Sequence, residues 1–226
     1  MNLQTIYRGK ELPFADYFES KKEDLIKEFL IQYPEFNSIE PLHNSDLMQN
    51  KITEALGNRT QPGSPWEILQ IKGTYFGEPP YYGSQPFEES KAKFPTATSI
   101  IDYFGFNVVR SISYSVLEPH STIARHWDHE NHEGKFIRVH IPLIVPHGDL
   151  GLEVNGEVVD WSESFGFNNL RLHSVWNFTD HRRLILLLDL ERLHLGLPDE
   201  PPWTEETNAG TVPFPKTPDH FLSKRN

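Results

Sequence analysis

The sequence predicts a mainly β fold, a sandwich or small barrel with flanking helices, and three observations support it. Short strand-like runs follow one another from Val108 to Arg192, with turn signals between them. The chain contains 18 prolines and 14 glycines, which favours irregular connections over a helix bundle. With 226 residues, 37% of them hydrophobic and 12% aromatic, it is long and apolar enough to bury a core.

Two helices are expected before the strands. Residues 20–23, SKKE, match a capping box, and apolar side chains follow at helical spacing until Pro34. This pattern predicts a helix over residues 20–33 whose apolar face packs on a sheet. A shorter helix is expected within residues 94–105. Two stretches rich in glycine and proline are expected to be loops, residues 57–66 and 77–86.

The strand-like runs lie in the second half of the chain and are rich in β-branched and aromatic residues. The predicted strand segments are residues 108–117, 136–146, 150–161 with an Asn-Gly turn, 172–178 and 182–192. Prolines recur after Leu197 and predict an irregular tail. We expect a single domain over residues 1–226, which divides into a β core at about 105–195, an N-terminal helical and loop part at 1–104, and a proline-rich tail at 197–226.

Composition excludes several classes of function. Lys and Arg number 21 against 32 Asp and Glu, a net charge of -11, so neither nucleic acid nor an anionic membrane is an expected partner. The absence of cysteine excludes disulfides, thiolate metal sites and a cysteine nucleophile. No apolar run is long enough for a signal peptide or a membrane span, and we therefore expect a cytoplasmic protein. The oligomeric state is not predicted.

The stretch HWDHENHEG, residues 126–134, is a candidate metal site. On an extended backbone, His126 and Asp128 point to the same face, so imidazole and carboxylate can bind one cation. A third ligand, His173, comes from a different predicted strand. Two histidines and one carboxylate form the facial ligand set of non-heme Fe(II) oxygenases. The alternatives are a wet polar loop without metal, or ligation by two rivals in the same stretch, His129 and His132.

Cationic and hydroxyl side chains on neighbouring predicted strands suggest an anionic ligand beside this site. Arg138 and His140 share one face of their strand, and the alternating serines of residues 111–115 line one face of another. Arg183 stands at the start of an apolar run, where a guanidinium can bind a carboxylate with two hydrogen bonds. Such an arrangement would fit a small dicarboxylate such as 2-oxoglutarate. Each arginine taken alone could equally form a surface ion pair.

From FPTATSIIDYFG, which begins at residue 94, to LLLDLER, which ends at residue 192, the chain resembles the aspartyl/asparaginyl β-hydroxylase family of Fe(II)- and 2-oxoglutarate-dependent dioxygenases. The resemblance is carried by the order and spacing of SVLEPHSTIARHWD, RVHIPLIVP, GLEVNGEVVDWSESFGFNN and LHSVWNFTDHRRLILLLDL. It implies a double-stranded β-helix, the jelly-roll or cupin-like fold. It also implies that Fe(II), 2-oxoglutarate and O2 are required.

The resemblance assigns roles to individual residues. His126 and His173 would be iron ligands, and Arg183, assisted by Ser115, would bind the distal carboxylate of 2-oxoglutarate. Arg138 and His140 would hold the other end of 2-oxoglutarate near the metal.

Asp128 departs from the pattern of the animal protein-modifying members, which have no acid two residues after the first histidine. An acid at this position makes the chain more similar to bacterial members that act on small molecules, such as the proline hydroxylases. It also argues against halogenation, because halogenases replace this carboxylate with a small residue to make room for chloride.

The leading hypothesis is therefore a hydroxylase of a free amino acid or small amino-acid derivative. One alternative is a hydroxylase of an Asp, Asn or Pro residue in a peptide or carrier-bound intermediate. Alternatives of another class are a metal-binding cupin-like protein without oxygenase activity and a pure interaction module. The cupin-like alternative would not require Arg183 or Arg138, and in an interaction module residues 126–134 would be only a polar loop.

Overall fold

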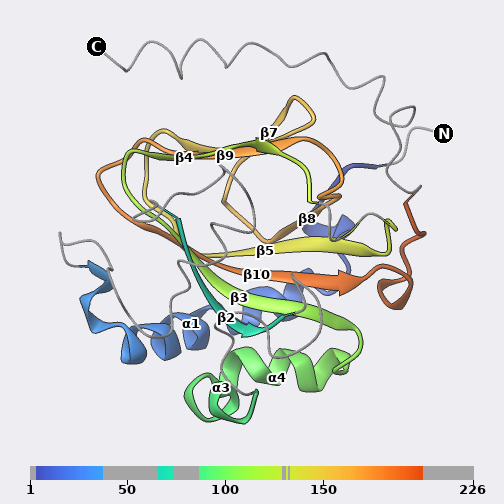
Figure 1. Ribbon diagram of the computed structural model, residues 1–226, viewed down its shortest axis with the longest axis horizontal. Coiled ribbons are helices and arrows are strands. Elements are labelled where there is room, and N and C mark those ends of the chain that lie inside the picture. Colours follow the sequence, from blue (N-terminus) through green and yellow to red (C-terminus); the bar gives the residue numbers. More distant parts are fainter. Residues whose placement is uncertain (1–3, 38–65, 74–86, 129–130, 132, 201–226) are drawn as a thin grey trace.

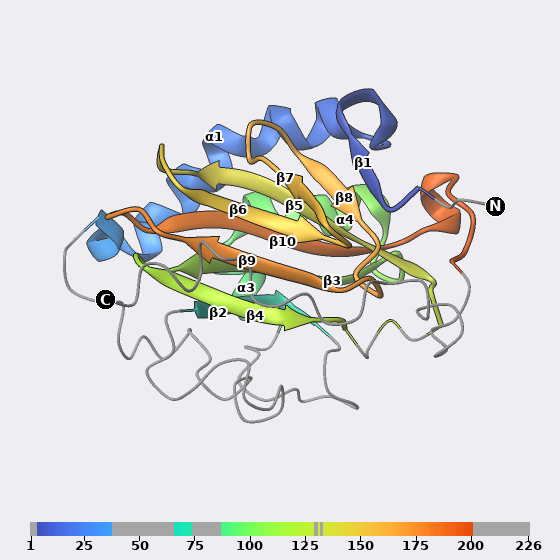
Figure 2. The same ribbon diagram turned by 90° about the horizontal axis from the view of Figure 1, so that it is seen from above.

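Two antiparallel β-sheets stacked face to face form the core of the computed structural model, which describes residues 4–37, 66–73, 87–128, 131 and 133–200 (Figure 1). Seen from above, the strands of the smaller sheet lie over those of the larger one (Figure 2). Helices cover only the outer face of the larger sheet (Figure 1). The prediction of a mainly β, jelly-roll fold is confirmed.

The order of the strands in both sheets differs from their order in the chain. The larger sheet runs β1 (Ile6–Arg8), β8 (Phe165–Phe167), β5 (Phe136–Ile144), β10 (Arg183–Glu191), β3 (Val109–Leu117) and β2 (Trp66–Lys72). The smaller sheet runs β4 (Ser121–His126), β9 (His173–Asn177), β6 (Leu150–Val154) and β7 (Glu157–Val159). Because the chain passes repeatedly from one sheet to the other, residues distant in sequence meet between the sheets.

The helices are α1 (Ala15–Gln32), α3 (Phe87–Lys93) and α4 (Pro95–Phe104), with 3₁₀ turns η1 (Gly9–Glu11), η2 (Pro34–Asn37) and η4 (Leu193–Leu195). Helix α1 packs against β5 and α4. The helix predicted within residues 94–105 is confirmed as α4, and Gly105, with φ of 101°, ends it.

The capping box expected at Ser20 is wrong. Helix α1 begins earlier, at Ala15, and the Ser20 hydroxyl lies inside it, donating to the carbonyl of Tyr17 at 2.7 Å. The buried face of the helix includes Phe18, which lies before the predicted start. Packing of this extra apolar turn against the core therefore decides where the helix begins, rather than the local capping signal.

Each predicted strand segment contains at least one strand. Residues 150–161 hold two, β6 and β7, joined by Asn155 at φ of 51° and Gly156 at φ of 89°, the left-handed pair that a tight hairpin requires. Four strands were not predicted: β1, β2, β4 and β8. Trp66, expected in a loop, is the first residue of β2. The remaining expected loop residues 57–65 and 77–86, and the tail 201–226, lie outside the described residues.

Alternation along β10 divides the interior into two layers. Leu184, Leu186, Leu188 and Leu190 belong to the core between the larger sheet and the helices. Ile185 instead packs in the core between the sheets, and Arg183 and Asp189 alternate with the leucines in the same way. The polar residues of β10 are thus directed into the space between the sheets, where the candidate site lies.

Within the described ranges, no helix is long and apolar enough to cross a membrane. Two of the ten strands, β1 and β2, come from the first part of the chain and pair at opposite edges of the larger sheet. The division into one domain with a tail stays a prediction.

We predict that Leu186→Ala lowers the free energy of unfolding by about 2–5 kcal/mol, because Leu186 is fully buried in the helix-side layer. The exposed Val158 provides the control, and Val158→Ala should change stability by less than about 0.5 kcal/mol. Urea unfolding followed by circular dichroism measures both. Equal effects of the two substitutions would contradict the assignment of Leu186 to a packed core.

Candidate active site

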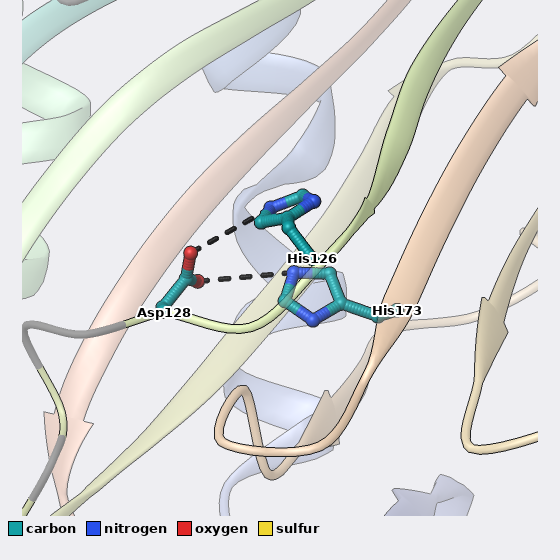
Figure 3. A group of neighbouring side chains, drawn as sticks. All are labelled: His126, Asp128 and His173. Atoms are coloured by element: carbon teal, nitrogen blue, oxygen red, sulfur yellow. Dashed lines mark ion pairs between the residues drawn. The ribbon is translucent and has the colours of Figure 1, made fainter. Parts of the chain in front are cut away.

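His126, Asp128 and His173 meet between the two sheets (Figure 3). His126 ends β4 and His173 begins β9, and the two are register partners beyond a shift that follows Ile123. His126 Nε2 lies 3.6 Å from Asp128 Oδ1, and His173 Nε2 lies 3.8 Å from Asp128 Oδ2. One ligand atom from each residue lies within 4.8 Å of the others. This geometry suits a single cation held on one side by three ligands.

Hydrogen bonds orient both imidazoles. Nδ1 of His126 lies 2.6 Å from the carbonyl oxygen of Ala124, and Nδ1 of His173 lies 2.8 Å from that of Arg171. With Nδ1 donating its proton to a carbonyl, the lone pair of Nε2 is available to a metal. Burial lowers the pKa of His173 from 6.5 to about 3, which keeps this ring neutral, as a metal ligand must be.

The carboxylate of Asp128 is held by its own set of partners. The backbone N–H of Asp128 donates to the carbonyl of Asn169 at 2.9 Å, and Asn169 Nδ2 donates to Asp128 Oδ2 at 3.1 Å. Asn131 Nδ2 in turn donates to Asn169 Oδ1 at 2.6 Å, and Arg138 Nη1 also donates to Asp128 Oδ2. Neither asparagine was predicted from the sequence, where the pair Asn168-Asn169 appeared only as part of a quoted motif.

A pocket opens beside the two histidines and contains every residue that the sequence predicted for cosubstrate binding. Its walls include Ser115, Arg138, His140 and Arg183 together with His126 and His173. Trp66, from the unpredicted strand β2, also lines it and donates from Nε1 to Ser115 Oγ at 2.9 Å. The rival ligands His129 and His132 lie outside the described residues.

Within the described residues, Arg183 is a buried cation without an anion. Its side chain is 1% exposed, Nη2 donates to Ser115 Oγ at 3.2 Å, and the guanidinium lies 4.9 Å from the ring centre of Trp161. Among the described residues, Nε has no hydrogen-bond partner. Burial lowers the pKa of Arg183 to about 9, and no charge of a described carboxylate opposes this shift. A guanidinium in this state would be stabilised by an anionic ligand.

His140 adds unused hydrogen-bonding capacity to the same pocket. Its ring stacks on Trp161, with centroids 5.4 Å apart and planes 9° apart, and within the described part of the chain neither ring nitrogen has a partner. Burial, followed by the charges of Arg183 and Arg138, lowers the pKa of His140 well below 6.5, so the ring is neutral. Trp161, which no sequence signal identified, contacts both His140 and Arg183 through its ring. The unused polar atoms of the pocket fit a ligand with carboxylate oxygens.

Arg138 has different partners from those expected. Its Nε and Nη2 donate to Asp189 Oδ1 and Oδ2 at 2.8 and 2.9 Å, and its Nη1 donates to Asp128. The register of β5 on β10 places Arg138 directly beside Asp189. Arg138 also lines the pocket, and its expected contact with 2-oxoglutarate stays a prediction. No local pattern predicts the pairing of Arg138 with Asp189, because Asp189 stands within an apolar run.

The chain was compared with known proteins. The family model described as Aspartyl/Asparaginyl beta-hydroxylase matches residues 19–193. No curated protein matches.

Three solved structures show weaker likeness. An oxidoreductase of the 2OG-Fe(II) oxygenase family from Burkholderia pseudomallei is 17% identical over 56% of this chain and 66% of its own, with a TM-score of 0.39. A prolyl hydroxylase from Trichoplax adhaerens, solved with a peptide fragment of hypoxia inducible factor, is 16% identical over 80% of this chain and 83% of its own, with a TM-score of 0.39. A predicted oxalate decarboxylase from Thermotoga maritima is 16% identical over 56% of this chain and 80% of its own, with a TM-score of 0.34. At TM-scores this low, these likenesses carry no functional argument.

We predict that Arg183→Met stabilises the protein without metal or dicarboxylate, raising the free energy of unfolding by about 1–4 kcal/mol, because it removes a buried charge that lacks an anion. Thermal and urea unfolding measure the change.

The matched control is Arg192→Met. Arg192 is also fully buried, yet it is paired with Glu200 Oε1 at 3.1 Å and Tyr7 Oη at 3.0 Å. Its loss leaves Glu200 buried without its partner and should cost about 3–5 kcal/mol. Destabilisation of similar size by both substitutions would show that Arg183 is satisfied within the fold.

Proposed function

The chain belongs to the aspartyl/asparaginyl β-hydroxylase family, and on that premise we propose that it hydroxylates an unactivated C–H bond of a free amino acid or small amino-acid derivative. The family makes the chain an Fe(II)- and 2-oxoglutarate-dependent dioxygenase. The observation that carries the proposal is a His-Asp-His cluster at a pocket that also contains a buried guanidinium for which the described residues provide no anion. The His-Asp-His cluster can bind a cation, and the buried guanidinium can bind a carboxylate.

His126, Asp128 and His173 would hold the iron. Two neutral imidazole Nε2 atoms and one carboxylate are a donor set that suits Fe(II) and leaves other positions open. When bound, iron supplies the activation of O2, coupled to oxidation of 2-oxoglutarate to succinate and CO2. The protein contributes ligands that its own hydrogen bonds have already oriented.

Arg183 and Ser115 would bind the distal carboxylate of 2-oxoglutarate. The Ser115 hydroxyl already accepts from Arg183 and Trp66, so its own proton can be donated to a ligand oxygen. His140, neutral and without a partner in the described structure, would donate to an oxygen at the other end. The aromatic rings of Trp66, Trp161 and Phe167 would keep water out of this part of the pocket.

Asp128 supports a small substrate, because an acid at this position makes the chain similar to the family members that act on small molecules. The net charge of -11 disfavours an acidic peptide. The alternative substrate is an Asp, Asn or Pro residue in a peptide or carrier-bound intermediate. The cupin-like alternative without oxygenase activity would leave the buried charge of Arg183 unexplained.

We predict that protein supplied with Fe(II), 2-oxoglutarate and O2 releases succinate and adds one oxygen atom to at least one member of a panel of free amino acids. Mass spectrometry detects both products. Asp128→Ala should abolish turnover, and Asp180→Ala, at an exposed aspartate paired with His120, should leave it unchanged. Succinate released only with peptide substrates would favour the alternative, and no succinate with either would contradict the proposal.

We further predict that Arg183→Met raises the concentration of 2-oxoglutarate needed for half-maximal turnover. The substitution removes a buried charge pair with the ligand, and this loss should weaken the binding free energy of 2-oxoglutarate by about 2–5 kcal/mol. Steady-state kinetics at saturating Fe(II) measure it. The neighbouring Arg182 provides the control, since it pairs with Glu118 at 2.9 Å and with the Phe36 carbonyl at 2.7 Å. Arg182→Met should leave the 2-oxoglutarate requirement of the folded protein unchanged. An unaltered requirement in Arg183→Met would remove Arg183 from the site.

A further inference from the structure

We propose that Asp189 is a positioning residue for the metal site, acting through Arg138 on the ligand carboxylate of Asp128. This inference rests on the proposed function, because it assumes that Asp128 binds the metal. Within the described structure, the Asp189 carboxylate is bound by Ser111 and Arg138, and its effect on Asp128 is transmitted by the Arg138 guanidinium.

The three side chains form a continuous buried chain. Asp189 on β10 and Arg138 on β5 are direct register partners, and the carboxylate accepts two hydrogen bonds from Nε and Nη2, at 2.8 and 2.9 Å. Arg138 Nη1 then donates to Asp128 Oδ2. Ser111 Oγ fixes the far end by donating to Asp189 Oδ2 at 2.8 Å. All four side chains are buried.

Asp189 holds Arg138 in one orientation. The side chain of arginine has many rotamers, but two parallel hydrogen bonds to one carboxylate define both the position and the plane of the guanidinium. The third donor, Nη1, is thereby aimed at Asp128 Oδ2, which also accepts from Asn169. The carboxylate plane of Asp128 is thus set from two sides, with Oδ1 within 3.6 Å of His126 Nε2.

Asp189 also preserves the negative charge that a metal ligand needs. If Arg138 had Asp128 as its only carboxylate, the two would form a neutral ion pair, and the guanidinium would compete with a cation for the carboxylate. Asp189 supplies a second negative charge, so the group of three carries one net negative charge facing the histidines. Its carboxylate therefore makes the site more attractive to a cation without being a ligand.

The surroundings of Asp189 indicate that packing does not require a carboxylate there. The preceding inward residues of β10, Ile185 and Leu187, are apolar and line the pocket. A buried carboxylate carries a desolvation cost, and an ion pair that merely offsets this cost adds little to stability. The carboxylate is explained by its effect on Arg138.

The test is equilibrium binding of Co(II) to metal-free protein, followed by the visible absorption of the bound ion. For Asp189→Asn, which keeps the shape but removes the charge, we expect binding about 10–100-fold weaker, as for other outer partners of metal ligands. The affinity for 2-oxoglutarate, measured at saturating Co(II), should change less than about threefold, because the Arg183–Ser115 pair is untouched. Substitutions that disturb the whole site would weaken both.

The matched control is Glu28→Gln. Glu28 is another buried carboxylate, but it lies on the helix side of the larger sheet and accepts from Tyr114 Oη at 2.9 Å and Ala97 N at 3.1 Å. Its substitution should lower stability and leave Co(II) affinity unchanged. Asp128→Ala gives the reference for a lost ligand. Co(II) affinity in Asp189→Asn within twofold of wild type would overturn the inference while leaving the proposed function intact, whereas wild-type protein that binds no Co(II) would remove both.

A milder substitution decides the matter if Asp189→Asn does not fold. Ser111→Ala removes one hydrogen bond to Asp189 and no charge, and should weaken Co(II) binding about 2–10-fold, in line with a loss of about 0.5–1.5 kcal/mol. Unchanged Co(II) affinity in folded Ser111→Ala would then overturn the role of Asp189.

Discussion

In the part of the chain that the structure describes, two guanidinium groups and two carboxylates lie buried between the two sheets, where an unpaired charge is costly because little water is present to solvate it. The protein treats the two arginines differently. Arg138 lies between the carboxylates of Asp128 and Asp189. Arg183 instead contacts the Ser115 hydroxyl and the Trp161 ring, and it contacts no carboxylate among the described residues. The first arginine is therefore part of the framework of the site, and the second is where a ligand's negative charge is needed.

The same four groups account for the pairing of a metal with a dicarboxylate. Among the described residues, Asp128 and Asp189 carry two negative charges, and Arg138 and Arg183 carry two positive charges, so these four groups sum to zero when the histidines are neutral. A divalent cation alone or a dianion alone would leave a buried charge of two units, and the two together restore neutrality. Electrostatics thus favours joint occupation of the pocket by Fe(II) and 2-oxoglutarate.

The main hydrophobic core and the candidate active site lie on opposite faces of the larger sheet. The leucines of β10 pack under the helices, together with the aromatic residues of α1 and α4, while the inward residues of the same strand face the pocket. The helix-side layer is closely packed and contains few charged groups, so it can hold the strands in register. That register is what brings Arg138 beside Asp189. The buried charges of the site lower stability, and the apolar layer on the helix side of the larger sheet offsets this cost without contributing residues to the site.

Local patterns in the sequence were enough to predict the β class, α4, five strand-bearing segments and the residue types of the site, because strand alternation and ligand chemistry are both encoded within a few neighbouring residues. They failed where a longer-range contact competes with a local signal, as at Ser20, where the packing of Phe18 extends the helix beyond its apparent cap. They also failed for Asn169, Trp161 and Asp189, which have no local signature. Which carboxylate faces which guanidinium depends on strand register across the sheet, and register is decided only when distant segments pack together. Composition and local pattern thus establish which chemical groups the chain carries, whereas the packing of distant strands establishes which of them are paired within the fold and which remain available to a ligand.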